Sequence, residues 1–545
     1  MVIYQTLPRL FGNKQAPAKP DGSLAENGVG KFADYTGQVL STIKELGVTH
    51  VWFTGAIAHA TQTNYTAYGI RPDHPSVVKG KAGSPYAIRD YYDVDPDLAV
   101  EVDNRMQEFE ALIARTHAAG MKVIIDFVPN HVSREYYSQA KPLGVNDLGE
   151  KDNTAVAFDP NNNFYYIPGQ SLHLGFVDSD YSEFPAKVTG NDCFDATPSH
   201  NDWYETIKLN YGVDYLGGRT AHFDPVPDTW KKMRDILFYW SEKQVDGFRC
   251  DMAEMVPVEF WGWMIPQVKQ HREALFIAEV YNPSEYENYL HQGHFDYLYN
   301  KVNLYDTLRD VICGCMPARN ISYAWQFNEG IQPYLLNFLE NHDEQRIASD
   351  FFIGNPQAAI PGMVVCATMN VGPVMIYNGQ ELGERGMDSE GFSGRDGRTT
   401  IFDYWSMETV RNWSSGGAFD TSLRRQYQQI LTLAHTEQAF SKGTFFDLMY
   451  VNLESGRFNF QKIYAYLRGY EKEVILVVAN FDGVAQHAEV MIPPVAFEML
   501  GIEENQGAEV TELLTGEKSI AALVSFSPYV VDVPAYGAKL LKFAY

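Results

Sequence analysis

Two runs of sequence decide the fold of this chain: Met121-Lys-Val-Ile-Ile-Asp-Phe127 and Val245-Asp-Gly-Phe-Arg-Cys250. Several runs of this kind are apolar nearly throughout, as strands covered on both faces must be. Segments with helical spacing separate them, among them Asp103–Ala119, Thr229–Lys243 and Ser422–Ala434. Eight runs occur in all: Val2–Leu7, His50–Phe53, Met121–Phe127, Val245–Cys250, Leu275–Val280, Phe295–Tyr299, Leu335–Leu339 and Val374–Tyr377. Strand and helix alternating eight times predict an α/β protein built on a (β/α)₈ TIM barrel.

Two regions depart from this alternation. The stretch 131–223, between the third and fourth runs, is rich in Asn, Asp, Gly, Pro and Tyr and is far too long for one helix, so we interpret it as an inserted, loop-rich domain. After the eighth helix, short alternating segments separated by turn residues predict an antiparallel β-sandwich; they include Ile463–Leu467, Val474–Val478, Ala488–Ile492 and Lys539–Phe543. The predicted domains are therefore a barrel formed by 1–130 and 224–445, an insertion 131–223, and a C-terminal β domain 446–545.

Charge and composition restrict the partners of the protein. Its 545 residues include 43 Lys and Arg against 69 Asp and Glu, a formal charge of −26 that repels nucleic acid and anionic membranes. No stretch approaches twenty apolar residues, and the first residues lack a signal-peptide pattern, which predicts a cytoplasmic protein unless a leader has been removed. Aromatic residues make up 14% of the chain. They favour a surface that stacks on neutral sugar rings, although a Tyr-rich core explains them equally well.

Polar side chains follow four of the predicted strands at the ends where barrel enzymes carry their active sites. The third run leads into Asp126 and His131, the fourth into Asp251, the fifth into Glu279, and the seventh into a His342-Asp343 pair. Because side chains alternate along a strand, Arg249 and Asp251 face the same way, and the guanidinium favours the ionised carboxylate. The carboxylates of Asp251, Glu279 and Asp343 are therefore expected to converge on one opening.

Carboxylates converging at a barrel mouth suit the cleavage of glycosidic bonds. One acts as nucleophile or base, and another protonates the leaving oxygen. A metal site is the physical rival, and helix capping or pairing with Arg explains any one of these acids alone. The joint pattern at four strand ends favours catalysis.

At these strand ends the sequence resembles family 13 of the glycoside hydrolases, the α-amylase family, over nearly the whole chain. The similarity rests on four motifs in the correct order: Asp126-Phe-Val-Pro-Asn130-His131, Gly247-Phe-Arg-Cys-Asp251, Ile277-Ala-Glu-Val280 and Phe338-Leu-Glu-Asn-His-Asp343. The resemblance implies that Asp251 is the nucleophile, Glu279 the acid/base and Asp343 the group that holds hydroxyls of the distorted sugar ring. It also implies Arg249, His131, His342 and Asp126 as partners at the cleaved sugar, with Tyr86 stacking under it. Glu279 must be protonated in the first step, which we expect a negative Asp251 to favour.

The inserted region carries a further motif, Glu205-Thr-Ile-Lys-Leu-Asn210, which is similar to the neopullulanase and cyclomaltodextrinase branch of the family. The resemblance matches the calcium ligands of other members to Asn130 and Asn210, and a neutral amide at the second position weakens a site for a hard cation. We therefore expect no required cofactor, with a structural calcium ion as the one candidate. Asp93, Asp95 and Asp97 are predicted to be solvated rather than to bind an ion.

Aromatic residues of the insertion bear on substrate size. Trp203 and Tyr204 precede the motif, and Phe164, Tyr165 and Tyr166 lie upstream. Such residues either stack on sugar rings over the barrel mouth or form a small core of the insertion itself. We expect Trp203 to bind substrate.

The leading hypothesis is a retaining hydrolase of α-1,4 bonds in maltooligosaccharides or α-glucans, with a neutral oligosaccharide or polysaccharide as its partner. A transglycosylase or isomerase of α-glucosides would use the same residues, because water and a sugar hydroxyl compete for one glycosyl-enzyme. A non-catalytic sugar-binding relative is disfavoured by the retention of Asp251, Glu279, Asp343 and Arg249. The sequence leaves open endo or exo action, tolerance of α-1,6 links and the oligomeric state.

Overall fold

A closed barrel of eight parallel strands forms the middle of the computed structural model, which describes residues 1–16, 19–387, 394–414, 420–453 and 457–544. The strand order around the barrel is β1-β16-β15-β14-β13-β12-β5-β2, which confirms the predicted fold. The strands are β1 (Val2–Thr6), β2 (His50–Phe53), β5 (Lys122–Phe127), β12 (Gly247–Cys250), β13 (Leu275–Ala278), β14 (Tyr297–Tyr299), β15 (Leu335–Phe338) and β16 (Val374–Tyr377). Each lies within one of the eight apolar runs of the sequence.

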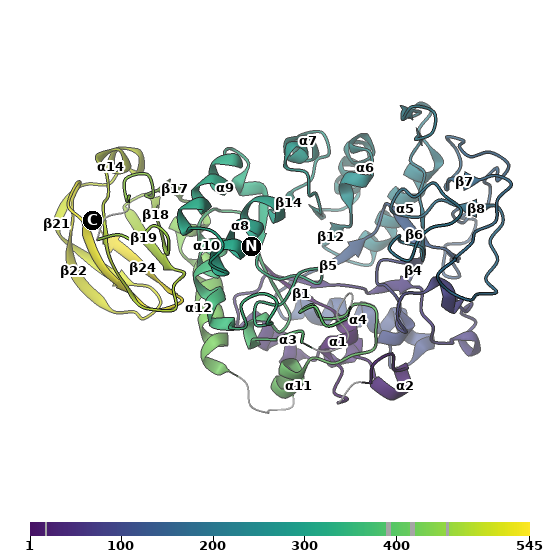
Figure 1. Ribbon diagram of the computed structural model, residues 1–545, viewed down its shortest axis with the longest axis horizontal. Coiled ribbons are helices and arrows are strands. Elements are labelled where there is room, and N and C mark those ends of the chain that lie inside the picture. The colour runs from purple at the N-terminus through teal and green to yellow at the C-terminus, as the bar shows by residue number, and fades with distance from the viewer. Residues whose placement is uncertain (17–18, 388–393, 415–419, 454–456, 545) are drawn as a thin grey trace.

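Helices surround the barrel and cover its outer face (Figure 1). The predicted helices appear as α4 (Arg105–Ala118), α5 (Asp228–Glu242) and α12 (Thr421–Thr436). The others around the barrel include α3 (Gly37–Lys44), α6 (Val258–His271), α7 (Tyr286–His291), α8 (Asp306–Ile312), α9 (Ile321–Phe327), α10 (Ile360–Thr368) and α11 (Glu408–Ser414). Their apolar faces and the outward side chains of the strands form one large core.

A second, smaller core fills the inside of the barrel. It contains one or two inward side chains from each of several strands: Ile3, Trp52, Ile124, Ile277, Tyr299, Leu336, Phe338 and Met375, together with Tyr305. The alternation of side chains along each strand places the next inward residues above this core. On β5 that residue is Asp126, two positions after Ile124, and after β13 it is Glu279, two positions after Ile277. The interior core thus supports polar groups at the carboxyl ends of the strands.

The long stretch between β5 and α5 folds into short antiparallel pairs. These are β6 (His131–Ser133) with β9 (Thr206–Lys208), β7 (Tyr166–Ile167) with β8 (Ala186–Lys187), and β10 (Val213–Asp214) with β11 (Thr220–Ala221). Another pair, β3 (Ile57–His59) and β4 (Ile88–Val94), lies between β2 and α4. The β6–β9 pair begins four residues after β5 ends, so it brings the inserted stretch to the mouth of the barrel.

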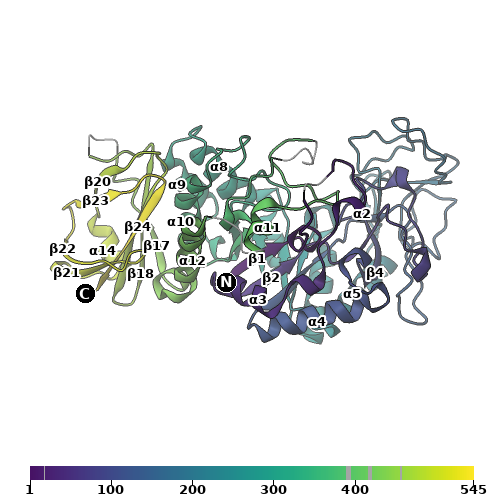
Figure 2. The same cartoon turned by 90° about the horizontal axis from the view of Figure 1, so that it is seen from below.

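The C-terminal part is an antiparallel sheet of six strands in the order β17-β18-β19-β24-β21-β22, beside a two-stranded sheet β20-β23. Their bounds are β17 (Thr444–Asp447), β18 (Ile463–Tyr470), β19 (Glu473–Asn480), β20 (Gln486–Val490), β21 (Asn505–Glu512), β22 (Lys518–Leu523), β23 (Tyr529–Val533) and β24 (Gly537–Ala544). Buried Arg468 joins β18 to the barrel helices, because its guanidinium donates to carbonyls of Thr368 and Phe440. Figures 1 and 2 show this sheet at the opposite end of the molecule from the inserted stretch.

Candidate active site

One buried arginine, Arg249 on β12, organises the mouth of the barrel. Its Nη1 lies 2.7 Å from Asp251 Oδ1 and 3.5 Å from Asp126 Oδ1, and its Nη2 lies 2.9 Å from Glu279 Oε2. Its Nε donates to the Tyr299 hydroxyl at 3.1 Å. The side chain is buried, so the planar fork holds the carboxylates in a fixed arrangement.

Backbone hydrogen bonds explain why these carboxylates meet. Arg249 pairs in register with Asp126 of β5, so the two side chains lie next to each other on the inner face of the sheet. The amide of Asp251 donates to the Phe127 carbonyl at 2.9 Å, and the amide of Glu279 donates to the Cys250 carbonyl at 3.1 Å. Both acids therefore extend the strand ladders by one residue, as the sequence predicts.

Glu279 accepts two further hydrogen bonds. The amide of Met252 donates to its Oε2 at 2.7 Å, and the hydroxyl of Tyr281 donates to its Oε1 at 2.6 Å. Met252 has a φ of +42°, a left-handed conformation that is strained for a residue with a side chain. The strained backbone at Met252, directly after Asp251, thus directs its amide toward the carboxylate of Glu279.

The close packing of charge affects Asp251. Burial raises its pKa well above the ordinary value, and the charge of Glu279 acts in the same direction, while Arg249 acts against both. The expectation from the sequence concerned Glu279, whereas the like-charge effect is seen here at Asp251.

Asp343 stands at the opening together with His342 and Tyr86. His342 Nε2 lies 3.1 Å from Asp343 Oδ2 and 2.5 Å from the hydroxyl of Tyr86. Desolvation opposes ionisation of Asp343, but the charges of His342 and Arg249 outweigh it and lower the pKa of Asp343. The Asp343 side chain is 31% exposed, so its carboxylate is available to a ligand.

Asp126 lies deeper than the other acids. Its Oδ2 accepts from the indole Nε1 of Trp52 at 3.1 Å and from the amide of Gly55 at 3.3 Å. Burial raises the pKa of Asp126 against the opposing charge of Arg249. This residue supports Arg249 and does not line the cavity.

A second buried cation, Lys208 of β9, fixes the orientation of His131. Lys208 Nζ donates to Asn130 Oδ1 at 2.8 Å, and an ammonium cannot accept, so the amide nitrogen of Asn130 faces the other way. That nitrogen lies 3.2 Å from His131 Nδ1, which must therefore be the acceptor. Burial first, and then the charges of Lys208 and Lys79, lower the pKa of His131 to about 3, so the neutral ring carries its proton on Nε2.

The residues matched to a calcium site do not fit a calcium ion. The side-chain oxygen of Asn130 accepts from the Lys208 ammonium, which itself lies 2.5 Å from Asp192 Oδ1. Asn210 donates its amide to the carbonyl of Asp159 at 2.8 Å and accepts from the amide of Gly212 at 2.8 Å. A cation would have to compete with an ammonium for its oxygen ligands. Among the described residues, no group of three or more His, Cys, Asp or Glu side chains is arranged to hold a metal.

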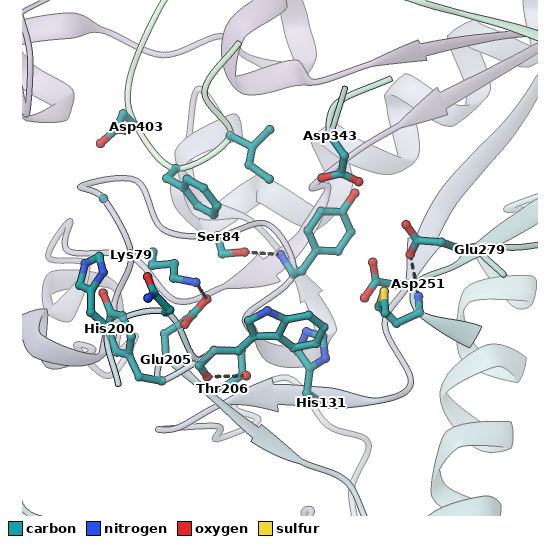
Figure 3. Close-up of a pocket in the computed structure, with 18 of the residues that line it drawn as sticks. Lys79, Ser84, His131, His200, Glu205, Thr206, Asp251, Glu279, Asp343 and Asp403 are labelled. Atoms are coloured by element: carbon teal, nitrogen blue, oxygen red, sulfur yellow. Dashed lines mark hydrogen bonds and ion pairs between the residues drawn. The ribbon is translucent and has the colours of Figure 1, made fainter. Parts of the chain in front are cut away.

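A cavity of about 590 Å³ opens over these residues (Figure 3). The structure places six of the predicted site residues in its lining: Asp251, Glu279, Asp343, His131, Tyr86 and Trp203. Arg249, Asp126 and His342 are buried beside it, and Asn130 and Asn210 are buried and do not line the cavity. The Trp203 ring packs at 5.2 Å from the His131 ring.

Tyr204, for which the sequence left open stacking on sugar or packing in the insertion, also lines the cavity. Other lining residues were not expected from the sequence: Lys79, Gly80, Ser84, His200, Asn201, Glu205, Thr206, Met252, Tyr281, Ile401, Phe402 and Asp403. Of these, Tyr281 was detectable, because it follows Glu279 by two residues. Phe164, Tyr165 and Tyr166 are buried instead and do not line the cavity, and Phe164 and Tyr166 pack in the large core around the barrel.

The prediction that Asp93, Asp95 and Asp97 are solvated is wrong. All three are buried, with exposed fractions of 6%, 0% and 0%. Arg105 forms three hydrogen bonds to Asp93, His59 pairs with Asp95, and the hydroxyls of Tyr65 and Tyr404 donate to Asp97. Distant partners in the sequence thus satisfy these acids inside the protein.

The eight-stranded barrel with carboxylates around one arginine at its carboxyl end defines a glycosidase of the α-amylase type. The chain matches the family described as "Alpha amylase, catalytic domain" over residues 23–428, and it belongs to that family. No helix in the described residues is long and apolar enough to cross a membrane.

Individual relatives are distant in sequence. Neopullulanase 2 of Thermoactinomyces vulgaris is 22% identical over 538 residues, which cover 95% of this chain and 74% of that protein. The crystal structure of a maltogenic α-amylase, AmyB from Thermotoga neapolitana, covers 100% of this chain with 99% of its own length, at a TM-score of 0.66 and 20% identity. A cyclomaltodextrinase structure has the same TM-score and identity, covering 99% of this chain and 77% of its own. The two structures show that the fold is shared.

Proposed function

We propose that this protein is a retaining glycosidase that cleaves α-1,4-glucosidic bonds of maltooligosaccharides through a covalent glycosyl-enzyme. One observation carries the proposal: a single buried guanidinium contacts both Asp251 and Glu279 at the mouth of the barrel. The names of the similar proteins, a neopullulanase, a maltogenic amylase and a cyclomaltodextrinase, support an α-glucan as the substrate.

In the first step, the Asp251 carboxylate attacks the anomeric carbon of the sugar. The bond to the glycosidic oxygen breaks, and the protonated carboxyl of Glu279 gives its proton to that oxygen. In the second step, Glu279 takes a proton from water, whose oxygen attacks the same carbon and releases Asp251. Two displacements restore the original configuration at that carbon.

The neighbouring groups have separate tasks in this scheme. Arg249 stabilises the ionised form of Asp251 that must attack, against the burial that raises its pKa. His131 offers its Nε2 proton to a sugar hydroxyl, and Asp343 accepts hydrogen bonds from others. Tyr281 donates to ionised Glu279, and its hydroxyl can turn to accept once Glu279 is protonated.

Proton NMR of the digestion of a maltooligosaccharide tests the proposal. We expect the first-formed product to have the α configuration, followed by slow mutarotation. A first-formed β product contradicts the retaining mechanism, and the absence of any cleavage contradicts the assignment to maltooligosaccharides. A product longer than the substrate at high sugar concentration identifies a transglycosylase in place of a hydrolase.

A further inference from the structure

Two walls from distant parts of the sequence enclose the cavity, and Lys79 lies between them. One wall is the inserted stretch with Trp203 to Glu205, and the other is the loop 401–403 after β16. Among the described residues that line the cavity, Lys79 is the only lysine or arginine. Neither the family motifs nor the mechanism above gives it a role.

Lys79 contacts both walls. On the inserted side, its Nζ lies 3.2 Å from Glu205 Oε1 and 5.6 Å from the centre of the Tyr204 ring. On the other side, the same Nζ lies 5.9 Å from the centre of the Phe402 ring. Glu205 is 4% exposed, and the Lys79 side chain is 26% exposed, so the ammonium is anchored on a buried carboxylate while part of the side chain faces the cavity. An ion pair and two cation–π contacts restrict the side chain in this position.

The backbone around Lys79 is held against loop 401–403. The amides of Ala82 and Gly83 both donate to the Phe402 carbonyl at 3.1 Å. Gly80 has a φ of +65°, and a side chain there would collide with that carbonyl, since an added Cβ would lie 2.2 Å from it. The segment 80–83, which directly follows Lys79, is therefore held close to loop 401–403.

Figure 3 shows where Lys79 lies relative to the two carboxylates of the proposed mechanism. Glu279 and Asp251 lie at one end of the site, and Lys79, Glu205 and Asp403 lie at the other. In the proposed function Glu279 protonates the leaving group, so the leaving part of the substrate lies on the Glu279 side. The part that stays on the enzyme extends toward Lys79.

We propose that Lys79 is a specificity-determining residue that limits how many sugar units fit on the side of the cavity remote from Glu279. The inference rests on the proposed function and makes the enzyme release short products from the non-reducing ends of chains. A neutral sugar chain that continued past this point would have to displace Lys79 from Glu205 and leave that buried carboxylate without its cation.

The test compares maltoheptaose with maltoheptaose whose non-reducing end is blocked as a cyclic acetal. For the unchanged enzyme we expect kcat/KM on the free substrate to exceed that on the blocked one by about tenfold or more. Lys79→Ala should bring this ratio close to one by raising the rate on the blocked substrate. Lys81→Ala is the matched control, because Lys81 contacts Gln62 and Asp21 and does not line the cavity. Its ratio should equal that of the unchanged enzyme.

Equal rates of the unchanged enzyme on both substrates overturn the inference, and so does a Lys79→Ala enzyme that keeps the original ratio. A uniform loss on both substrates would also overturn it, because it would show that Lys79 binds sugar. Lys79→Gln, which shortens the side chain and removes its charge, provides the same comparison if the alanine variant does not fold. If the unchanged enzyme cleaves neither substrate, the proposed function fails, and this outcome is distinct from all of these.

Discussion

Two buried cations, Arg249 and Lys208, have different partners and serve different purposes. Arg249 is on a barrel strand and contacts three carboxylates, those of Asp126, Asp251 and Glu279. Lys208 is on a short strand of the insertion and contacts one amide oxygen and one carboxylate. The guanidinium of Arg249 pairs with several carboxylates at once. The ammonium of Lys208 instead binds the side-chain oxygen of Asn130, which a calcium ion would need as a ligand.

The difference follows from the chemistry of the two side chains. A guanidinium presents several donors in one plane and can hold two carboxylates at once, which suits a reaction that moves charge between them. An ammonium is a compact point charge, and burial lowers the pKa of Lys208 while Asp192 raises it. The proposed function gives Arg249 and its carboxylates the catalytic role, whereas the contacts of Lys208 hold Asn130 and, through it, His131 in place.

Removing one of the two carboxylates that Arg249 contacts most closely, Asp251 or Glu279, should have the largest effect on activity. We expect Asp251→Ala and Glu279→Gln each to lower kcat on maltooligosaccharides by at least about 10³-fold, because each removes one half of a two-step mechanism. The protein should stay folded by circular dichroism. The control is Asp246→Asn. Asp246 directly precedes β12, at the opposite end of that strand from Asp251, and its carboxylate binds His117. Activity near that of the unchanged enzyme in either carboxylate variant would refute the site.

Substitution of Trp203, which lies beside His131, should have a smaller effect on activity. Trp203 lines the cavity and packs on the His131 ring, so we expect Trp203→Ala to lower kcat/KM for soluble maltooligosaccharides by about tenfold, with little loss of melting temperature. The unchanged enzyme should prefer these substrates to granular or long-chain starch. Equal efficiency on long amylose, together with a silent Trp203→Ala, would show that the cleft is open.

Substitution of Asp251 and substitution of Asp343 should change the melting temperature at pH 7 in opposite directions. Burial raises the pKa of Asp251, so its contribution to stability is present below the unfolded pKa and is lost as pH rises through the folded one. Asp251→Asn should therefore raise the melting temperature at pH 7 by about 1–2 °C, and the gain should vanish toward pH 4. The pKa of Asp343 is lowered instead, so Asp343→Asn should destabilise the protein at pH 7 and approach the unchanged protein as pH falls. Melting curves from pH 4 to 8 check both, and shifts of the same sign contradict the account.

We expect a chelator to have no effect on this protein. Because the Lys208 ammonium already binds the side-chain oxygen of Asn130, EDTA should leave the melting temperature and activity unchanged. Lys208→Met should lower the melting temperature equally with and without EDTA, since it leaves Asn130 and Asp192 without their partner. A large loss in EDTA that calcium restores would show that a metal binds here.

The sequence predicted the barrel and the polar groups at its mouth because both depend on short-range patterns. Each strand is a local apolar run, and the alternation of side chains places Arg249 beside Asp251. The resemblance to the α-amylase family then linked Asp251, Glu279 and Asp343, which lie far apart along the chain.

Features that depend on distant partners were not predictable in this way. Lys79 meets Glu205 and Phe402 only in the folded protein, and no periodic pattern marks these positions. The burial of Asp97 depends on Tyr404, more than three hundred residues later. An aspartate in a loop is usually solvated, so the tertiary partner overrides the local preference.

The central claim is that Asp251 is the nucleophile, and trapping the glycosyl-enzyme tests it most directly. In Glu279→Gln, an α-glucosyl fluoride can still react, since fluoride leaves without a proton, but the variant lacks the base that activates water. The account predicts that mass spectrometry will find one added glucosyl group, on the peptide that contains Asp251. A glucosyl group on any other residue would contradict it.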